Sequence, residues 1–195
     1  VSRADGEVTD LDVKKAMEDS EKNLGQLKNK KILHTVPVKF KLDGEEVMGR
    51  PTGLKGLKLE VKTLFVVCLS QHFEDLIEAI ESAGIEVIDV IASPIAASIV
   101  SLTKKQRNVG CILVNIGAET VSIAVYENDT PISLDVFPIG STDITNDMAL
   151  GLKISPDEAE RLKLGSNTEM YSKKKLDEII EARLSDIFDL IDSHL

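Results

Sequence analysis

The sequence predicts an α/β fold, in which a small α+β layer precedes an antiparallel strand meander with flanking helices. Three observations support this prediction. Hydrophobic residues make up 43% of the 195 residues, which is enough for a packed core. Segments with apolar residues at every second position alternate with segments of helical period along the chain. Two of the predicted strands, about 110–115 and 120–126, are joined by a short turn that contains Gly117.

The first ninety residues predict the order helix, strand, strand, strand, helix, strand. Thr9 and Asp12 have the spacing of a capping box at the start of a helix. The alternation over 32–42 predicts a half-buried strand, with Pro37 near an edge of the sheet. The other predicted elements are an Asp43-Gly44 hairpin turn with a short strand through Val47, a strand over 59–69, a helix capped by Ser70 and a strand over 85–91.

The second half predicts helices on both sides of three short strands. Ser93-Pro94 starts a helix, because proline is tolerated in a first helical turn. Residues 104–108 are predicted as a polar connector, and the strands follow over about 110–115, 120–126 and 131–137. The remaining predicted helices run over 142–150, from the cap at Ser155 through Lys163, and from Ser172 towards the end.

Composition excludes several functional classes. The net charge of −10 disfavours binding to nucleic acid and to anionic lipid, so we expect no nucleic-acid partner. Cys68 and Cys111 lie in apolar segments without metal-ligand spacing, which predicts two small buried residues in a reducing cytoplasm. No apolar segment reaches the length of a membrane span.

The turn between the first two strands of the meander is the best candidate for chemistry. A tight turn at Gly117 can direct several backbone N–H groups into one small space, and such a set of donors suits a phosphate. Thr120 adds a hydroxyl group. The alternative is a hairpin whose glycine and threonine have only a structural role.

Several stretches in the same order resemble a known superfamily. Ser93-Pro94-Ile95-Ala96-Ala97, Asn115–Thr120 and Phe137–Thr145 are similar to motifs of the actin, DnaK-chaperone and sugar-kinase proteins. Within that superfamily the chain resembles the FtsA family of bacterial cell-division proteins. The stretches that carry this second resemblance are Val8–Val13, His34–Asp43 and Pro51–Val61.

The resemblance implies two domains. Residues 1–91 would form the inserted subdomain of the FtsA family. Residues 92–195 would form part of an actin-like, ribonuclease H-like ATPase lobe with an antiparallel strand meander. The first phosphate loop, the adenosine loop and the C-terminal membrane-binding helix of the family have no counterpart here, so we expect an internal fragment that binds ATP weakly or not at all by itself.

The same resemblance implies ATP and Mg²⁺ as cofactors of the full-length protein and assigns residues to them. Asn115 stands where the family has an aspartate that holds Mg²⁺ through water, and an amide holds a hard cation less strongly. At most a weak ATPase is therefore expected, and no catalytic residue is assigned. The implied nucleotide-binding residues are Gly117, Ala118, Glu119, Thr120, Gly140, Glu160 and Lys163.

Each of these assignments has a structural alternative. Asn115 could simply complete a strand end, Gly140 could simply start a helix, and Glu160 and Lys163 could form an ordinary surface ion pair, since they lie three residues apart on one helix.

The implied function is that of an actin-like protein that polymerises at the division site, at the inner face of the cytoplasmic membrane. It would link the FtsZ ring to that membrane and to later division proteins. Self-association is expected through residues 1–91, FtsZ binding through a lobe mostly outside this chain, and membrane binding through the missing helix.

Two alternatives remain open at this point. One is an adaptor for type IV pilus assembly that resembles PilM and shares the inserted subdomain. The other is an ATP-dependent phosphotransferase, against which Asn115 counts.

Overall fold

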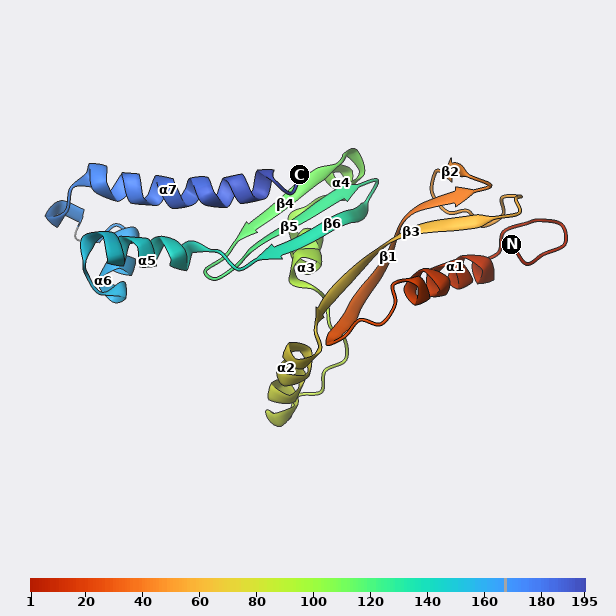
Figure 1. Ribbon diagram of the computed structural model, residues 1–195, viewed down its shortest axis with the longest axis horizontal. Coiled ribbons are helices and arrows are strands. Elements are labelled where there is room, and N and C mark those ends of the chain that lie inside the picture. Colours follow the sequence, from red (N-terminus) through yellow and green to blue (C-terminus); the bar gives the residue numbers. More distant parts are fainter. Residues whose placement is uncertain (167) are drawn as a thin grey trace. The chain divides into compact units, whose positions relative to one another are not determined.

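The computed structural model describes residues 1–166 and 168–195, which form helices and two three-stranded sheets (Figure 1). The predicted α/β class is therefore confirmed. The chain divides into two compact units: Val1–Cys111 with Val125–Ser133, and Ile112–Ala124 with Leu134–Leu195. The boundary after residue 91 that the sequence predicts stays a prediction.

The first sheet has β1 (Lys30–Leu42) at its centre, antiparallel to both β2 (Glu45–Val47) and β3 (Leu59–Leu69). Asp43 and Gly44 form the hairpin turn, both with positive φ. Pro37 is tolerated in this central strand because β2 pairs only with Phe40–Leu42, and a register shift follows Pro37 in the pairing with β3. Within the described residues, the part of β1 that precedes Phe40 therefore has no partner strand on the side of β2, as in an edge strand.

Helix α1 (Asp10–Asn23) packs against β3, and the hydroxyl of Ser20 donates a hydrogen bond to Thr63 Oγ1 over 3.0 Å. The predicted capping box is confirmed: Asp12 N donates to Thr9 Oγ1 over 3.3 Å, and Thr9 N donates to Asp12 Oδ2 over 2.9 Å. The other oxygen of Asp12 accepts from the backbone N–H of Ser2 over 2.7 Å and from its hydroxyl. One carboxylate therefore joins the N-terminal segment to the start of the helix.

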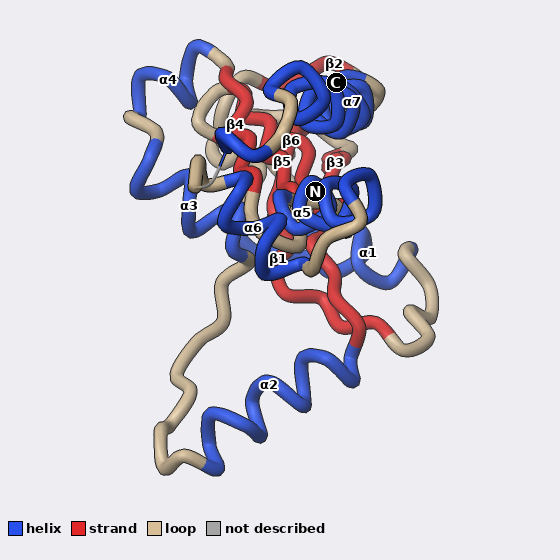
Figure 2. Tube along the Cα trace, turned by 90° about the vertical axis from the view of Figure 1, so that its left-hand side faces the viewer, coloured by secondary structure: helices blue, strands red, loops and turns tan. Residues whose placement is uncertain are grey.

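The predicted strand over 85–91 is wrong. Helix α2 (Ser70–Ser82) directly follows Leu69, whose backbone is extended. Leu69 is at the N-cap position, and the predicted side-chain cap at Ser70 is not formed. The following residues 83–92 return to the next helix as a loop, which Figure 2 shows in tan. A strand needs a partner for its backbone, and within the described residues none pairs with this segment, which leaves Ile88 94% exposed.

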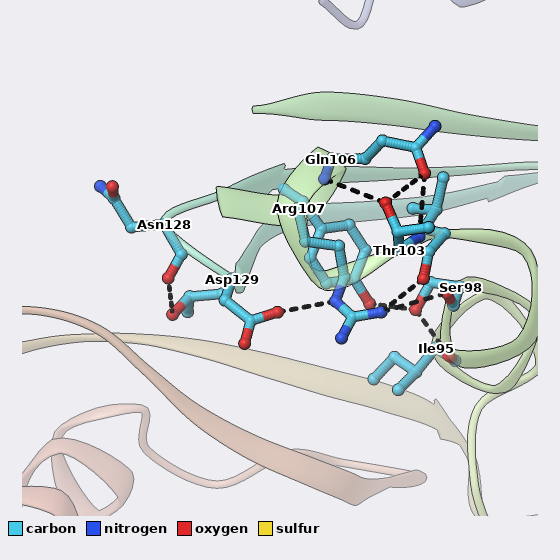
Figure 3. A network of polar contacts seen from close by, with 10 residues as sticks. Ile95, Ser98, Thr103, Gln106, Arg107, Asn128 and Asp129 are labelled. Carbon is cyan, nitrogen blue, oxygen red and sulfur yellow. Dashed lines mark hydrogen bonds and ion pairs between the residues drawn. The ribbon is translucent and has the colours of Figure 1, made fainter. Parts of the chain in front are cut away.

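A network of polar contacts surrounds helices α3 (Ser93–Ser101) and α4 (Lys104–Val109) (Figure 3). The Arg107 guanidinium donates to Asp129 Oδ1 over 2.7 Å and to the carbonyl of Leu102 over 2.9 Å. The buried hydroxyl of Ser98 bonds to the Ile95 carbonyl and to the hydroxyl of Tyr126. These contacts fix the end of α3 to the turn between the second and third strands of the next sheet.

The polar connector predicted over 104–108 is also wrong, because this segment is the helix α4. Thr103 and Gln106 form a capping box in which Gln106 Oε1 accepts from the N–H of Thr103 over 2.9 Å and from its hydroxyl over 2.8 Å. The capping spacing was present in the sequence and outweighs the polar composition.

The second sheet has the order β4 (Cys111–Ile116), β5 (Val121–Glu127) and β6 (Thr130–Phe137), as the predicted meander requires. Links this short can only join antiparallel neighbours. Asn128 and Asp129 connect β5 to β6, with φ of 51° and 63°, the conformation of a type I′ hairpin turn.

Three helices follow the second sheet: α5 (Ser141–Leu152), α6 (Pro156–Lys163) and, after the short helix η1 (Thr168–Met170), α7 (Lys173–Asp192). They share a core that is built from their apolar faces. Its buried members are Ile144, Met148, Ala149, Ala159, Leu162 and Leu176. Among the described residues, no helix combines the length and the apolar character that crossing a membrane would require.

The first prediction concerns Asp12, which is 6% exposed. Hydrogen bonds from the Ser2 hydroxyl and then from Thr9 hold the pKa of this carboxyl well below its usual range. Because the pKa is lower in the folded state, Asp12 stabilises the fold above about pH 4, and this contribution is lost as the pH falls below that value. Asp12→Asn should lower the denaturation midpoint at about pH 7 and should differ less from the unsubstituted chain at about pH 2.

The matched control is Asp19→Asn, which removes an exposed carboxylate from the same helix. It should leave the midpoint nearly unchanged at both values. An equal loss for the two variants, or a loss for Asp12→Asn that does not depend on pH, would contradict the role given to the Asp12 carboxylate.

Candidate functional site

The turn between β4 and β5 is closed by one backbone hydrogen bond, from Gly117 N to the carbonyl of Thr120 over 2.8 Å. Ala118, Glu119 and Thr120 are exposed. Within residues 1–166 and 168–195, nothing accepts a hydrogen bond from the N–H groups of these three residues. Exposed donors without a protein acceptor are available to a ligand.

The start of α5 fixes the orientation of this turn. Ser141 N donates to the carbonyl of Gly117 and Thr142 N donates to the carbonyl of Ala118, each over 2.9 Å. In a trans peptide the carbonyl and the following N–H point in opposite directions. The N–H groups of Ala118 and Glu119 therefore point away from α5, while the two carbonyls satisfy the first N–H groups of the helix.

The contact between the turn and α5 leaves no room for a side chain at Gly140. A Cβ atom at this position would lie 2.2 Å from the carbonyl oxygen of Ala118 and 2.7 Å from that of Gly117. Its φ of −165° is extended and open to any residue, so the constraint is the close approach of the backbones. Gly140 N donates to Asp143 Oδ2 over 2.8 Å, which completes the start of the helix.

The side chain of Glu119 is held on the helix side of the turn. Its Oε1 accepts a hydrogen bond from the hydroxyl of Thr142 over 2.8 Å. The carboxylate therefore lies on the same side as α5, and the N–H groups of Ala118 and Glu119 face the opposite way. A negative charge beside a phosphate would be repulsive, and this contact draws it aside.

Glu160 and Lys163 lie on α6 and meet the same turn of α5. Their charged groups are 2.7 Å apart, and Lys163 Nζ also donates to the carbonyl of Ser141 over 3.1 Å and to Thr145 Oγ1 over 2.8 Å. Hydrogen bonds from Lys163 and then from Thr145 hold the pKa of the Glu160 carboxyl below its usual range. Glu160 thus stays ionised and its charge is largely balanced by Lys163.

Asn115 lies in β4, two residues before the turn, and its residue is exposed. The described part of the chain contains no group of three or more His, Cys, Asp or Glu side chains that could enclose a metal ion. A hydrated Mg²⁺ needs few direct protein ligands, since it keeps most of its water and is held by substrate phosphates. The amide of Asn115 suits that kind of contact and no stronger one.

The structure thus brings most of the sequence-predicted residues to the first turn of α5. The turn at Gly117–Thr120 contacts it through backbone bonds, Gly140 precedes it, and Glu160 and Lys163 bind it from α6. Sequence reasoning missed the connecting residues Ser141, Thr142 and Thr145. Two signals in the sequence point to them: they lie in the stretch Phe137–Thr145 that carries the resemblance, and small polar side chains at i and i+4 place Ser141 and Thr145 on one face of the helix.

Two family models match the chain. One, described as "Cell division protein FtsA", matches residues 112–187, and the other, "SHS2 domain inserted in FTSA", matches residues 1–67. The turn, α5 and α6 all lie within the first match, and residues 68–111 lie between the two matches.

Curated cell-division proteins named FtsA are similar to the chain over most of its length. That of Bacillus subtilis (strain 168) is 34% identical over 150 residues, which cover 77% of this chain and 34% of that protein. That of Pseudomonas aeruginosa is 25% identical over 217 aligned positions, covering 100% and 52%, and that of Escherichia coli (strain K12) is 28% identical over 175, covering 90% and 41%. The chain spans about a third to a half of the length of these relatives.

Two solved structures have a similar fold. A chain of the PilM-PilN type IV pilus biogenesis complex aligns with a TM-score of 0.68 at 15% identity, covering 97% of this chain and 52% of that one. The ethanolamine utilization protein EutJ from Carboxydothermus hydrogenoformans aligns with a TM-score of 0.53 at 21% identity, covering 65% and 43%. These likenesses concern the fold, and they support the predicted α/β class.

The second prediction tests the contact at Gly140. Gly140→Ala should lower the free energy of unfolding by about 1–3 kcal/mol, because the added methyl group must displace two backbone carbonyls. Thermal or denaturant unfolding measures this change. Amide NMR shifts of Ala118 and Glu119 should move in the variant, since their peptide groups carry those carbonyls.

Gly151→Ala is the matched control in the same helix. There the added Cβ would meet only the flexible tip of Ile179, at 2.9 Å, and alanine is favoured inside a helix by about 1 kcal/mol. It should be neutral or stabilising. If Gly140→Ala proved as harmless as Gly151→Ala, the turn and the helix would not be in the contact described.

Proposed function

This chain belongs to the FtsA family of bacterial cell-division proteins, and we propose that in the full-length protein it supplies one side of an ATP site that controls assembly at the division site. The observation that carries the proposal is local. A turn with exposed backbone donors and an ionised carboxylate–ammonium pair are both attached to the first two turns of one helix.

The turn at Gly117–Thr120 is the proposed phosphate site. The N–H groups of Ala118 and Glu119 point away from α5, and the dipoles of such groups stabilise anionic oxygens without a charged side chain. Gly140 lets the start of α5 approach the backbone of the turn, and Gly117 lies where a Cβ atom would be 3.0 Å from the carbonyl oxygen of Thr120. The hydroxyl of Thr120 adds a donor beside them.

The pair Glu160 and Lys163 is the proposed contact for the nucleoside of ATP. Hydroxyl groups of a ribose donate to a carboxylate, and an ammonium group donates to ring or sugar oxygen and nitrogen atoms. Asn115 would face Mg²⁺ through water. Because an amide carries no charge, it would stabilise the metal less than a carboxylate, which favours slow turnover of ATP.

We further propose the organisation that the family suggests. Residues 1–91 act as the inserted subdomain, which contacts a neighbouring protomer and other division proteins, and residues 92–195 belong to the ATPase lobe. The full-length protein polymerises and links the FtsZ ring to the inner face of the cytoplasmic membrane. FtsZ and the membrane would be bound mainly by parts outside this chain.

The third prediction concerns nucleotide affinity. In the full-length protein, Lys163→Ala should raise the Kd for a fluorescent ATP analogue about tenfold, because it removes a charge-assisted donor and releases Glu160. Fluorescence titration measures the change. Arg161→Ala, which removes an exposed charge from the same helix, should leave the Kd unchanged. Equal Kd values for the two variants would argue against a nucleoside contact at α6.

The fourth prediction concerns ATP turnover. The unmodified full-length protein should hydrolyse ATP slowly, and Asn115→Asp should raise the rate by restoring a negative charge on the metal side. Phosphate release at saturating ATP and Mg²⁺ measures both rates. Fast turnover by the unmodified protein would favour a phosphotransferase or ATPase over an assembly protein.

A further inference from the structure

Thr145 is a buried hydroxyl residue at the centre of the contacts between α5 and α6. Its side chain is 5% exposed. The hydroxyl accepts a hydrogen bond from Lys163 Nζ over 2.8 Å and donates to Glu160 Oε2, with the carbonyl of Ser141 3.3 Å away as a second acceptor. One hydroxyl therefore contacts both members of the charged pair.

The contact between the two charged groups does not by itself fix the position of the Glu160 carboxylate. Glu160 and Lys163 lie on the same helix, and an i,i+3 pair of long side chains keeps its contact while both side chains turn. Thr145 belongs to the other helix and is buried, so it holds the carboxylate relative to α5. Within the described residues, Thr145 is the only side chain of α5 that contacts the Glu160 carboxylate directly; Lys163, which is bonded to the same carboxylate oxygen, is itself held to α5 by the Ser141 carbonyl and by the Thr145 hydroxyl.

Helix α5 in turn is attached to the proposed phosphate turn. Ser141 and Thr142 donate their N–H groups to the carbonyls of Gly117 and Ala118. Thr145 lies one helical turn after Ser141. The spacing between the Glu160 carboxylate and the N–H groups of Ala118 and Glu119 is therefore set through a short, continuous chain of hydrogen bonds.

Only one oxygen of Glu160 is used by these contacts. Oε2 bonds to Thr145 and Lys163, whereas Oε1 has no hydrogen-bond partner among residues 1–166 and 168–195. The side chain is 45% exposed, so Oε1 can be reached by a ligand. A carboxylate oxygen in this state is an acceptor for a hydroxyl group.

We propose that Thr145 is a positioning residue that holds the Glu160 carboxylate at a fixed distance from the Gly117–Thr120 turn and thereby sets the preference of the site for a nucleotide with an intact ribose. This inference rests on the ATP site proposed above. Oε1 of Glu160 accepts from a ribose hydroxyl while the phosphates lie on the turn. Thr145 itself does not touch the nucleotide.

The other charged groups around α5 do not compete for this role. Asp143 accepts a hydrogen bond from the N–H of Gly140, and Asp147 forms a bidentate ion pair with Arg183, with N···O distances of 2.6 and 3.0 Å. The ionised state of Glu160 thus depends on Lys163 and Thr145. Removing the hydroxyl should raise the pKa of Glu160 and let its side chain move.

The experiment compares Thr145→Val and Thr145→Ala, which remove the hydroxyl, with Thr145→Ser, which keeps it. Each is made in the full-length protein, and Kd is measured for ATP and for 2′,3′-dideoxy-ATP. The unsubstituted protein and Thr145→Ser should bind ATP roughly tenfold more tightly than the dideoxy analogue, since one hydrogen bond to a charged group is lost. Thr145→Val and Thr145→Ala should bind the two nucleotides within about twofold of each other.

Asn146→Ala is the control in the same helix, because Asn146 is exposed, and it should keep the full preference. The pKa of the Glu160 carboxyl, measured by carbon NMR, should rise in Thr145→Val and return in Thr145→Ser. A merely structural role for Thr145 would change stability without moving either quantity. Two variants without the hydroxyl are made, so that the Kd values can still be compared if one of the variants does not fold.

The outcomes separate the two proposals. If the unsubstituted protein binds neither nucleotide, the proposed ATP site is wrong and the role of Thr145 falls with it. If it binds ATP with a preference for the ribose, and the folded hydroxyl-free variants keep that preference, the ATP site stands and the positioning role of Thr145 is overturned.

Discussion

The close contact between the carbonyls of Gly117 and Ala118 and the first N–H groups of α5 is the constraint on which the candidate site depends. It satisfies helix donors that otherwise need a cap, and it turns the following N–H groups outward. Only glycine at position 140 permits the approach, because a side chain there would overlap both carbonyls. The turn, the helix and the charged pair on α6 are consequently one assembly.

Hydrogen bonds between helix ends and nearby turns recur in the first unit of the chain. Arg107 connects a carbonyl at the end of α3 to Asp129 in the β5–β6 turn (Figure 3). Asp12 connects the start of α1 to the N-terminal segment. In each case a group that the helix leaves without an internal partner is satisfied by a residue that also fixes a loop. Contacts at helix ends therefore help to fix the conformations of these loops.

Elements with strong local signals could be predicted from the sequence. The capping box at Thr9, the hairpin at Asp43-Gly44 and the strand over 59–69 agree with the structure because their determinants lie within a few residues. The segment 85–91 shows the limit: its strand propensity needs a partner strand, which propensity does not supply. The polar composition of 104–108 predicts a connector, whereas the capping spacing of Thr103 and Gln106 is the local signal that agrees with helix α4.

The candidate site divides in the same way. The turn and Gly140 carry recognisable local patterns, and Glu160 and Lys163 were placed on one helix face by their spacing. Their meeting at the first turn of α5 could not be predicted, because it depends on contacts between residues that are far apart in the sequence. The role of Thr145 follows only from the packing of α6 on α5, since its place in the stretch Phe137–Thr145 does not indicate which groups its hydroxyl contacts.

The loop at 83–92 has a consequence for the behaviour of the chain in concentrated solution. Ile85, Ile88 and Ile91 are 60%, 94% and 49% exposed in a segment with strand propensity, a combination that favours intermolecular β-pairing. Glu86 and Asp89 interrupt it with negative charge, as gatekeeper residues do beside aggregation-prone sequences. Colloidal stability here therefore rests on electrostatic repulsion, and it weakens as acid or high salt removes that repulsion.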